Sequence, residues 1–367
     1  MTSIDAAVLH GPRDLTVERV DLAPPEADEV RVKICAAGVC HTDYARYVGE
    51  SNVRYPVILG HEGAGVVEAV GERVTTVEPG DRVVLTVITH CGSCAACDRG
   101  KPFLCENDGP VHDGRLIDGT RRLSIDGEPI DHFFAQSSFA TRAVVPATTA
   151  ISIQSEIPFE RMALLGCCAS TGVGSVLSTA TVEPASSVAV FGCGGVGMSA
   201  VLGGVTVGAS PLVAVDMATN RLEMAAELGA THTVDPRSAD VVEHVVDLTH
   251  GGADYTFECS GNQQAGEQAL AATRKGGTVV MVGGGDPENS LSVHPNRDLV
   301  PGGKTIVGSV AGSLRPHEDI PRYARLCADG HLNLDALITH RYDLSKLPSA
   351  FETMAAGAGV RGVVTFD

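Results

Sequence analysis

Four cysteines, Cys91, Cys94, Cys97 and Cys105, are spaced x2, x2 and x7 in a segment that is otherwise rich in Gly, Ser and Asp. This spacing is typical of zinc ligands, and four thiolates complete the tetrahedral coordination of zinc. A set of buried structural thiols is the alternative. Apolar packing, however, does not require cysteines at every third position. The segment therefore predicts a closed metal site that holds structure and leaves no position for a substrate.

Three further candidate ligands are spread along the chain. Cys40 lies in G-V-C-H-T-D, His61 in G-H-E and Cys167 in L-L-G-C-C. Two thiolates and one imidazole leave a fourth zinc position open for water or a substrate, so such a site can do chemistry. Each residue taken alone is more typical of a core cysteine or a hydrogen-bonded histidine. From spacing alone, the second site is a hypothesis.

A dinucleotide-binding pattern begins where the apolar stretch V-A-V-F, residues 188–191, runs into G-C-G-G-V-G and then a helix. Glycines at this turn let a pyrophosphate approach the free N–H groups of the helix N-terminus. Asp216 follows at the end of the next expected strand, where a carboxylate binds ribose hydroxyls and repels a 2′-phosphate. The pattern predicts NAD binding, with a tight turn without ligand as the alternative. The turn residues are Gly192, Gly194, Gly195, Val196 and Gly197.

Periodicity divides the chain into two kinds of structure. Residues 5–90 have the pattern of short strands between Gly, Pro and Asp turns, whereas strands and helices alternate from residue 187 onward. After about residue 310 the pattern changes to one amphipathic helix, 319–329, and a final strand, 360–366. We expect an α/β protein with a mainly β domain, 1–168 and 311–367, and an inserted doubly wound parallel-sheet domain, 169–310. The turn-rich segment 106–136 is expected to be an extended loop.

Composition narrows the class of partner. The 367 residues are enough for two domains, and the formal net charge of −18 argues against nucleic acid or an anionic membrane surface. The first residues do not have the pattern of a secretory signal, and the apolar runs are too short to span a bilayer. The eleven cysteines cluster at ligand-like spacings. These features predict a cytoplasmic protein that acts on a small molecule.

Five stretches, taken in order, resemble the zinc-dependent medium-chain alcohol dehydrogenases over essentially the full chain. They are G-V-C-H-T-D (38–43), G-H-E-G-A-G-V-V-E-A-V-G (60–71), L-L-G-C-C-A-S-T-G-V-G-S (164–175), F-G-C-G-G-V-G (191–197) and R-G-V-V-T-F (361–366). The resemblance implies a GroES-like catalytic domain, a Rossmann coenzyme domain and reversible NAD-linked oxidation of primary alcohols to aldehydes. It also implies two zinc ions per subunit. The implied ligands are Cys40, His61 and Cys167 for the catalytic ion and Cys91, Cys94, Cys97 and Cys105 for the structural ion.

The same resemblance implies roles for residues around the two cofactors. Asp43 would orient His61 by accepting its second ring N–H, and Glu62 would lie beside the metal and move in during ligand exchange. Thr42 matches the position whose hydroxyl binds the substrate oxygen. The implied coenzyme contacts are Thr171 to the nicotinamide, Arg221 to the adenosine ribose, and His41 and Arg361 to the pyrophosphate.

Two positions depart from the family pattern. Ala45 stands where many liver-type members have a histidine that passes the alcohol proton to solvent. The relay must then use water, the ribose hydroxyls or another base. Cys168 stands at a position that is usually glycine. We expect an inert packing residue there, with an oxidation-sensitive thiol as the alternative.

The segment F-F-A-Q-S-S-F-A-T, residues 133–141, is similar to aryl and benzyl alcohol dehydrogenases, a branch that includes enzymes for allylic terpene alcohols. By this resemblance Phe133 and Phe134 would line the pocket and stack on a flat substrate. Plain core packing is the alternative. We therefore expect aryl or allylic alcohols as substrates.

Three expectations remain open at this stage. A thiol-dependent formaldehyde dehydrogenase, acting on S-hydroxymethyl-glutathione or a similar adduct, is the alternative enzyme. A non-catalytic NAD-binding structural protein is disfavoured, since such relatives generally lose zinc ligands and all seven candidates are present. We expect a homodimer, with a tetramer possible, because the 106–136 segment resembles the insertion of dimeric members and a strand near 309–311 could pair across a two-fold axis.

Overall fold

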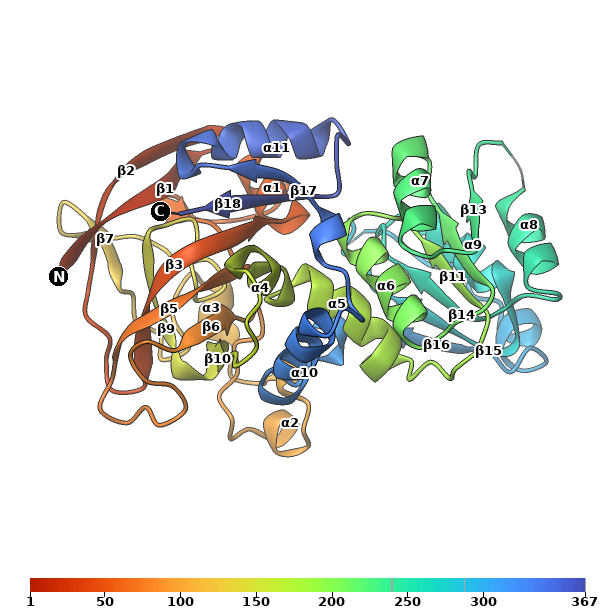
Figure 1. Cartoon of the computed structure of the whole chain (residues 1–367), viewed down its shortest axis with the longest axis horizontal. Coiled ribbons are helices and arrows are strands. Elements are labelled where there is room, and N and C mark those ends of the chain that lie inside the picture. The colour runs from red at the N-terminus through yellow and green to blue at the C-terminus, as the bar shows by residue number, and fades with distance from the viewer. Residues whose placement is uncertain (239, 287, 367) are drawn as a thin grey trace. The chain divides into compact units, whose positions relative to one another are not determined.

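The computed structural model describes residues 1–238, 240–286 and 288–366, which form two compact units (Figure 1). The first unit comprises Met1–Cys167, Arg315–Gly330 and 338–366. The second comprises Cys168–Leu314 and His331–Leu337. A mainly β unit thus contains both ends of the described chain, and an α/β unit is inserted into it.

The first sheet of the mainly β unit has five strands in the order β4-β1-β2-β7-β8. In β1, alternate residues enter two different cores: Ala6 and Val8 pack in one cluster, and Ala7 and Leu9 in the other. This two-residue period is the geometry of a strand that is buried on both faces. The strands are β1 (Thr2–Gly11), β2 (Asp14–Leu22), β4 (Val57–Ile58), β7 (Leu123–Ile125) and β8 (Glu128–Pro129).

The second sheet has seven strands, six of them in the order β10-β6-β5-β3-β18-β17, with β9 also paired to β3. The last strand, β18, lies antiparallel to β3, with Gly362 opposite Val39. This pairing brings residue 361 beside the end of β3, where the first candidate ligand follows. The strands are β3 (Glu29–Val39), β5 (Gly63–Val70), β6 (Arg82–Leu85), β9 (Arg142–Pro146), β10 (Ala150–Ser152), β17 (Ile338–Tyr342) and β18 (Arg361–Thr365).

Short helices complete the mainly β unit. Tyr47, the last residue of α1, stacks on Phe351 of α11 with ring centres 4.7 Å apart, which fixes α1 to the larger core. The expectation that 106–136 is only an extended loop is wrong, because the segment contains α3, β7 and β8. The helices are α1 (His41–Tyr47), α2 (Ala95–Asp98), α3 (Gly109–His112), α4 (Phe159–Leu165), α10 (Pro316–Ala328) and α11 (Leu347–Ala355).

The inserted unit contains a six-stranded parallel sheet in the order β13-β12-β11-β14-β15-β16. All residues of β11 and β12 are buried, as expected for strands covered by helices on both faces. The strand order reverses between β11 and β14, and such switch points are where open α/β sheets bind ligands. The strands are β11 (Val188–Phe191), β12 (Leu212–Val215), β13 (His232–Val234), β14 (Ala253–Glu258), β15 (Thr273–Met281) and β16 (Thr305–Gly308).

The helices of this unit are α5 (Cys168–Gly174), α6 (Gly195–Thr206), α7 (Thr219–Glu227), α8 (Val241–Leu248) and α9 (Gln263–Ala272). The expected fold class, a mainly β domain plus a doubly wound parallel-sheet domain, is confirmed. The strand expected near 309–311 is misplaced, because β16 ends at Gly308 and Ala311–Ser313 is a short helical turn.

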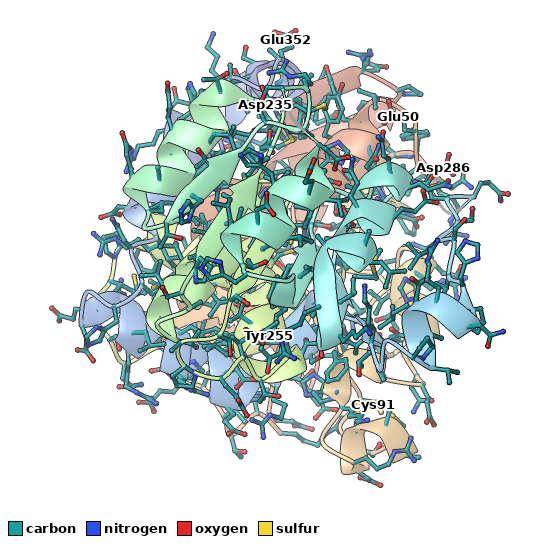
Figure 2. The ribbon with its side chains drawn as sticks, turned by 90° about the vertical axis from the view of Figure 1, so that its right-hand side faces the viewer. Glu50, Cys91, Asp235, Tyr255, Asp286 and Glu352 are labelled. Atoms are coloured by element: carbon teal, nitrogen blue, oxygen red, sulfur yellow. The ribbon has the colours of Figure 1, made fainter. Side chains whose placement is uncertain are left out.

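Three acidic residues illustrate the exposed negative charge. Glu50, Asp286 and Glu352 are exposed side chains, labelled in Figure 2. In the described part of the chain no single helix is long and apolar enough to cross a membrane, and one pair, Phe159–Leu165 and Cys168–Thr179, reaches that length and hydropathy only when taken together.

Candidate functional site

The four clustered cysteines bring their sulfur atoms together. All four lie within 4.8 Å of one another, although Cys105 comes from a different turn than the other three. Backbone N–H groups point at the sulfurs: Ser93 N lies 3.5 Å from Cys91 Sγ, and Glu106 N lies 3.4 Å from Cys94 Sγ. The Ser93 N–H lowers the pKa of Cys91 to about 6. Four sulfur atoms this close together form a donor set that fits a structural zinc ion and leaves no open position.

A second cluster lies where the ends of β3 and α4 meet the start of β5. The ligand atoms of Cys40, His61, Glu62 and Cys167 also lie within 4.8 Å of one another. Cys40 is the residue between β3 and α1, and Cys167 follows α4. The first three are almost completely buried. Two sulfurs, one imidazole and one carboxylate form a donor set that fits zinc with an exchangeable position.

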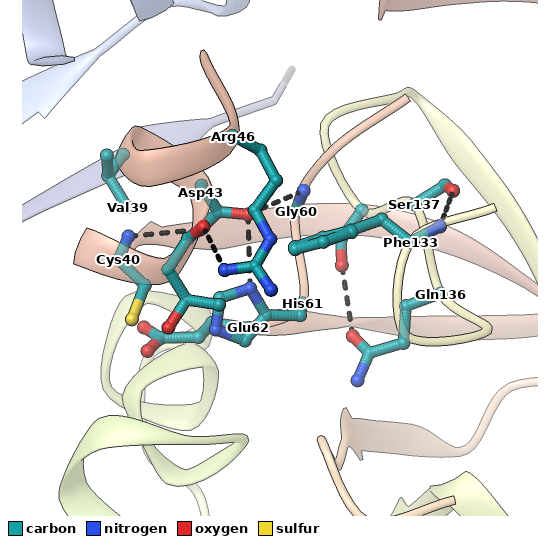
Figure 3. A network of polar contacts seen from close by, with 12 residues as sticks. Val39, Cys40, Asp43, Arg46, Gly60, His61, Glu62, Phe133, Gln136 and Ser137 are labelled. Atoms are coloured by element: carbon teal, nitrogen blue, oxygen red, sulfur yellow. Dashed lines mark hydrogen bonds and ion pairs between the residues drawn. The ribbon is translucent and has the colours of Figure 1, made fainter. Parts of the chain in front are cut away.

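Asp43 fixes the orientation of His61. Its Oδ1 lies 3.1 Å from His61 Nδ1, and the carboxylate also accepts hydrogen bonds from Cys40 N at 3.2 Å and Gly60 N at 3.0 Å (Figure 3). Burial opposes a charge on His61, but Asp43 and Cys40 outweigh it and raise the pKa of His61 well above its usual value. With Nδ1 engaged, Nε2 is the ring atom that can bind a metal.

Glu62 and Arg361 form a buried ion pair beside this cluster. The Nη2 of Arg361 contacts Glu62 Oε1, and its Nη1 donates to Val39 O at 2.9 Å. Burial raises the pKa of Glu62 to about 7 although Arg361 opposes this shift. Packing is tight here, because a Cβ on Gly38 would lie 1.9 Å from Glu62 Oε2. The sequence places Arg361 at the coenzyme by resemblance, whereas only the β3–β18 pairing reveals its contact with Glu62.

Two phenylalanine rings flank the candidate ligand His61. The ring centre of Phe133 lies 5.6 Å from that of His61, and the Phe134 ring centre lies 5.1 Å from it. The loop that carries them is unusual, since Phe134, Ala135 and Ser137 have positive φ. Such strain clusters at functional sites. Both rings also contact the larger core, so they serve packing and the site together.

The helix α1, which begins directly after Cys40, carries three further residues that bear on the site. Thr42 is half-buried, Ala45 is buried, and Arg46 is half-buried with its guanidinium carbon 5.5 Å from the ring centre of Phe133. The sequence reasoning missed Arg46. Its spacing from Thr42, four residues, is the signal that could have placed both on one helical face.

The glycine turn of the second unit has the geometry that dinucleotide binding requires. Gly192 has φ +89°, and a Cβ on Gly197 would lie 1.8 Å from Gly192 O, so both positions need glycine. A Cβ on Gly194, the N-cap of α6, would meet no atom within 4 Å. Gly195 and Val196 begin α6, whose N-terminus can therefore receive a pyrophosphate.

Asp216 follows β12 and is held by the same turn. Its carboxylate accepts hydrogen bonds from Cys193 N at 2.7 Å and Ala218 N at 2.8 Å. Arg221 Nη1 lies 3.7 Å from Asp216 Oδ2. The acid is thus fixed at the end of a strand next to the switch point, where an adenosine ribose would be bound.

Three predicted residues lie outside these clusters. His41, the first residue of α1, is exposed, with its ring centre 5.6 Å from that of Tyr44. Thr171 is buried in α5 of the second unit. Cys168, the first residue of α5, is fully buried.

Comparison with known proteins covers nearly the whole chain. Residues 26–155 match the alcohol dehydrogenase GroES-like domain, and residues 195–329 match the zinc-binding dehydrogenase family. Alcohol dehydrogenase class-3 of Drosophila melanogaster is 38% identical, covering 98% of this chain and 97% of that protein. S-(hydroxymethyl)glutathione dehydrogenase of Komagataella pastoris is 36% identical, covering 96% and 94%. The crystal structure of benzyl alcohol dehydrogenase from Acinetobacter calcoaceticus is 34% identical, with a TM-score of 0.95 over 100% of both chains.

Proposed function

Because the chain belongs to the zinc-dependent medium-chain alcohol dehydrogenases, we propose that it oxidises primary alcohols whose carbinol carbon is attached to an aromatic ring or a double bond. It is an oxidoreductase whose cofactors are zinc and a nicotinamide dinucleotide. Of the two dinucleotides we assign NAD, since the carboxylate of Asp216, held by Cys193 N and Ala218 N, would repel a 2′-phosphate. A similar kcat/KM with NADP would contradict this assignment.

The residues around His61 support this chemistry. Zinc, when bound by Cys40, His61 and Cys167, supplies Lewis-acid polarisation of the substrate oxygen. Asp43 holds the imidazole in one orientation. Thr42 offers a hydroxyl on the same short helix, while the buried methyl group of Ala45 can carry no proton. The alcohol proton therefore leaves through water, the coenzyme ribose or another base.

We assign the two zinc sites to the first unit and coenzyme binding to the second. The assignment of the zinc sites rests on the two clusters of candidate ligands, both of which lie in the mainly β unit. The assignment of coenzyme binding rests on the glycine turn at the switch point of the parallel sheet. We further propose a cytoplasmic homodimer, with the tetramer as the alternative assembly.

The observation that carries the substrate proposal is the pair of rings beside His61. Phe133 and Phe134 lie at right angles, with ring centres 4.8 Å apart, and both contact the imidazole. Aromatic faces reward a flat substrate, and a tenfold preference requires only about 1.4 kcal/mol of differential transition-state binding. The likeness to a benzyl alcohol dehydrogenase supports the same class.

Steady-state kinetics test this proposal. Benzyl and cinnamyl alcohol should exceed ethanol by more than about tenfold in kcat/KM with NAD. Phe133→Ala should reduce that ratio more than it reduces activity on ethanol. Phe159→Ala provides the control, because this ring stacks on Arg82, whereas the aromatic rings found beside His61 in the described residues are Phe133 and Phe134. Equal kcat/KM for ethanol and benzyl alcohol in the wild-type enzyme would refute the proposal.

A thiol-dependent formaldehyde dehydrogenase is the second candidate. It is favoured by the class-3 and S-(hydroxymethyl)glutathione relatives, which are slightly more similar in sequence than the benzyl alcohol enzyme. Formaldehyde oxidation with and without added glutathione separates the two functions. Absolute dependence on the thiol, together with poor turnover of benzyl alcohol, would replace the first proposal with this one.

A further inference from the structure

A cavity of about 300 Å³ lies in the first unit, with Phe133 and Phe134 in its lining. This is the lower end of the range for small-molecule sites. Its walls are partly aromatic and partly basic, with contributions from the end of α1, the 52–54 turn, α3 and the 131–134 segment. Its lining includes Arg46, Arg54, Asp131, His132, Phe133 and Phe134.

Arg46 is the cation of this cavity that has no acid partner. Its Nη1 donates to Thr42 O at 3.2 Å, one turn back on α1, and its guanidinium lies over the Phe133 ring. Among the described residues no carboxylate lies within ion-pair distance of it, and its buried Nε has no hydrogen-bond partner. This contact uses one of the five N–H donors of the guanidinium.

The acidic side chains nearest to Arg46 are already bound to other groups. Asp131 is shared by Arg54 Nε at 3.0 Å and Arg121 Nη2 at 2.6 Å. Asp43, the acid that acts most strongly on Arg46, is bound to Cys40 N, Gly60 N and His61. Asp113 and His112, the other ionisable groups of the lining, are exposed.

A second unpartnered donor lines the same cavity. His132 is 2% exposed, and its Nε2 accepts the N–H of Arg122 at 3.0 Å. The neutral ring must then carry its proton on Nδ1, which has no hydrogen-bond partner among the described residues. A buried donor without an acceptor is costly, and each such group calls for an explanation. Two such N–H donors in one cavity suit a ligand group that accepts hydrogen bonds.

The cavity is also placed next to the reacting centre. The Arg46 guanidinium carbon lies 5.5 Å from the centre of the Phe133 ring, and that ring centre lies 5.6 Å from the centre of the His61 ring (Figure 3). A substrate with its carbinol at the metal cluster and its flat body along Phe133 would direct its far end toward Arg46.

We propose that Arg46 is a specificity-determining residue that binds a carboxylate on the substrate, so that the favoured substrates are flat aryl or allylic alcohols that carry a carboxylate remote from the carbinol. The inference rests on the proposed function and names a narrower substrate class within it. The planar guanidinium fork matches a carboxylate bidentately, and Phe133 beneath it holds the fork in place.

Three substrates and three variants test the proposal. The zinc-loaded enzyme is assayed with NAD on benzyl alcohol, 4-methylbenzyl alcohol and 4-(hydroxymethyl)benzoate. The ratio of kcat/KM for the carboxylate to that for the methyl compound should exceed about tenfold in the wild type. Arg46→Met should lower this ratio at least tenfold, mainly through KM, and Arg46→Lys should retain part of it. Arg54→Met is the matched control, because its charge is already paired, and its ratio should stay within threefold of wild type.

The outcomes separate this inference from the function on which it rests. If the wild type prefers the methyl compound, or if Arg46→Met leaves the ratio unchanged, the carboxylate subsite is refuted while benzyl alcohol activity still stands. If no benzylic alcohol is turned over, the proposed function itself fails. A carboxylate can also come from a thiol adduct, so formaldehyde plus glutathione is assayed in parallel. An effect of Arg46→Met on that reaction alone would overturn the aryl and allylic class.

Discussion

His132 shows how one buried side chain ties stability to pH. Burial, assisted by Arg122 and Arg121, lowers the pKa of His132 to about 3. In the unfolded chain the pKa is near 6.5, so between these values the unfolded state binds the additional proton. The stability contributed at neutral pH is therefore lost as pH falls below 6.5, by up to about 1.4 kcal/mol per pH unit, and does not change above it.

Replacing this group with one that cannot titrate should remove its share of the acid sensitivity. In His132→Gln the amide oxygen can still accept the N–H of Arg122. We expect the urea-unfolding midpoint of this variant to fall less between pH 7 and pH 5 than that of the wild type. His112→Gln, at an exposed position, should follow the wild-type curve. If the urea-unfolding midpoints of the wild type and His132→Gln fell equally between pH 7 and pH 5, His132 would not be a source of the acid sensitivity.

Individual residues differ in how much of their role the sequence reveals. The spacing of Cys91, Cys94 and Cys97 is local, so the chain itself carries the information that these thiols meet. Arg46 and Arg361 behave differently, because their neighbours are set by a helix of seven residues and by a strand pairing that spans most of the chain. The local pattern can place Arg46 on one helical face with Thr42, but it does not reveal the contact of Arg46 with Phe133 or that of Arg361 with Glu62.

At the scale of elements, the turn between β11 and α6 needs glycine for two different reasons: close backbone packing at Gly197 and space for a ligand at Gly194. An added methyl at Gly197 would overlap Gly192 O, whereas one at Gly194 would enter open space and its φ of −75° suits any residue. Gly197→Ala should therefore lower the thermal midpoint by several degrees, and NADH binding should be lost with it. Gly194→Ala should keep the wild-type midpoint but raise the NADH Kd at least tenfold, because the methyl blocks the approach of the pyrophosphate.

The two measurements distinguish fold from ligand. Thermal unfolding without coenzyme reports packing, and fluorescence titration with NADH reports binding. Wild-type NADH affinity in Gly194→Ala would show that the open space beside this residue does not receive the coenzyme. An unchanged thermal midpoint in Gly197→Ala would show that α6 can move away from the turn at little cost.

The two candidate zinc sites should respond differently to the loss of one ligand. One is the segment 91–105, called here the four-cysteine lobe, and the other is the cluster of Cys40, His61, Glu62 and Cys167. The lobe has only two short helical segments, α2 and the turn Pro102–Leu104, and its cysteines form their own small cluster. Zinc should therefore supply most of its stability. Cys97→Ser should lower zinc content from two ions per chain to one and reduce the thermal midpoint. Cys40→Ser should reduce kcat by more than about 100-fold while the midpoint changes little, because β3 and α1 are anchored in the larger core.

Elemental analysis and calorimetry on the same preparations check this pair. A zinc content of one ion per wild-type chain would show that one of the two proposed sites does not bind zinc. A large fall in the midpoint of Cys40→Ser, with none in Cys97→Ser, would reverse the structural and catalytic assignments.

Elements were predictable where their period repeats. The alternation of apolar strands and helices after residue 187 gave the parallel sheet, since each unit is long enough to show its period. Helix α1 is too short to show a helical period and follows directly on a strand, so the pattern of residues 5–90 predicts only short strands and turns and does not reveal this helix. Short elements such as α3 and β7 in 106–136 are fixed by tertiary contacts and not by local propensity.

On the scale of the whole molecule, the return of the chain to its first domain was predictable and its partner strand was not. The change of pattern after about residue 310 indicates that the insertion ends, and the structure pairs the final strand β18 with β3. Which strand receives β18 depends on packing between segments more than 300 residues apart, and composition carries no trace of that choice.

The parallel sheet ends in an edge that suits association of two chains. Strand β16 is the last strand of its sheet and has no buried residue, so its outer N–H and C=O groups are open to another strand. Val300 and Val310, on either side of it, are 78% and 49% exposed. Pairing of β16 with its two-fold-related copy would join the two sheets and cover apolar surface that a monomer leaves in water.

Light scattering should therefore give twice the chain mass of 38.0 kDa. Val310→Asp should shift the mass toward the monomer, whereas Val17→Asp, at an exposed position on β2 in the other unit, should not. A monomer or a tetramer in the wild type, or a dimer that survives Val310→Asp unchanged, would refute this interface.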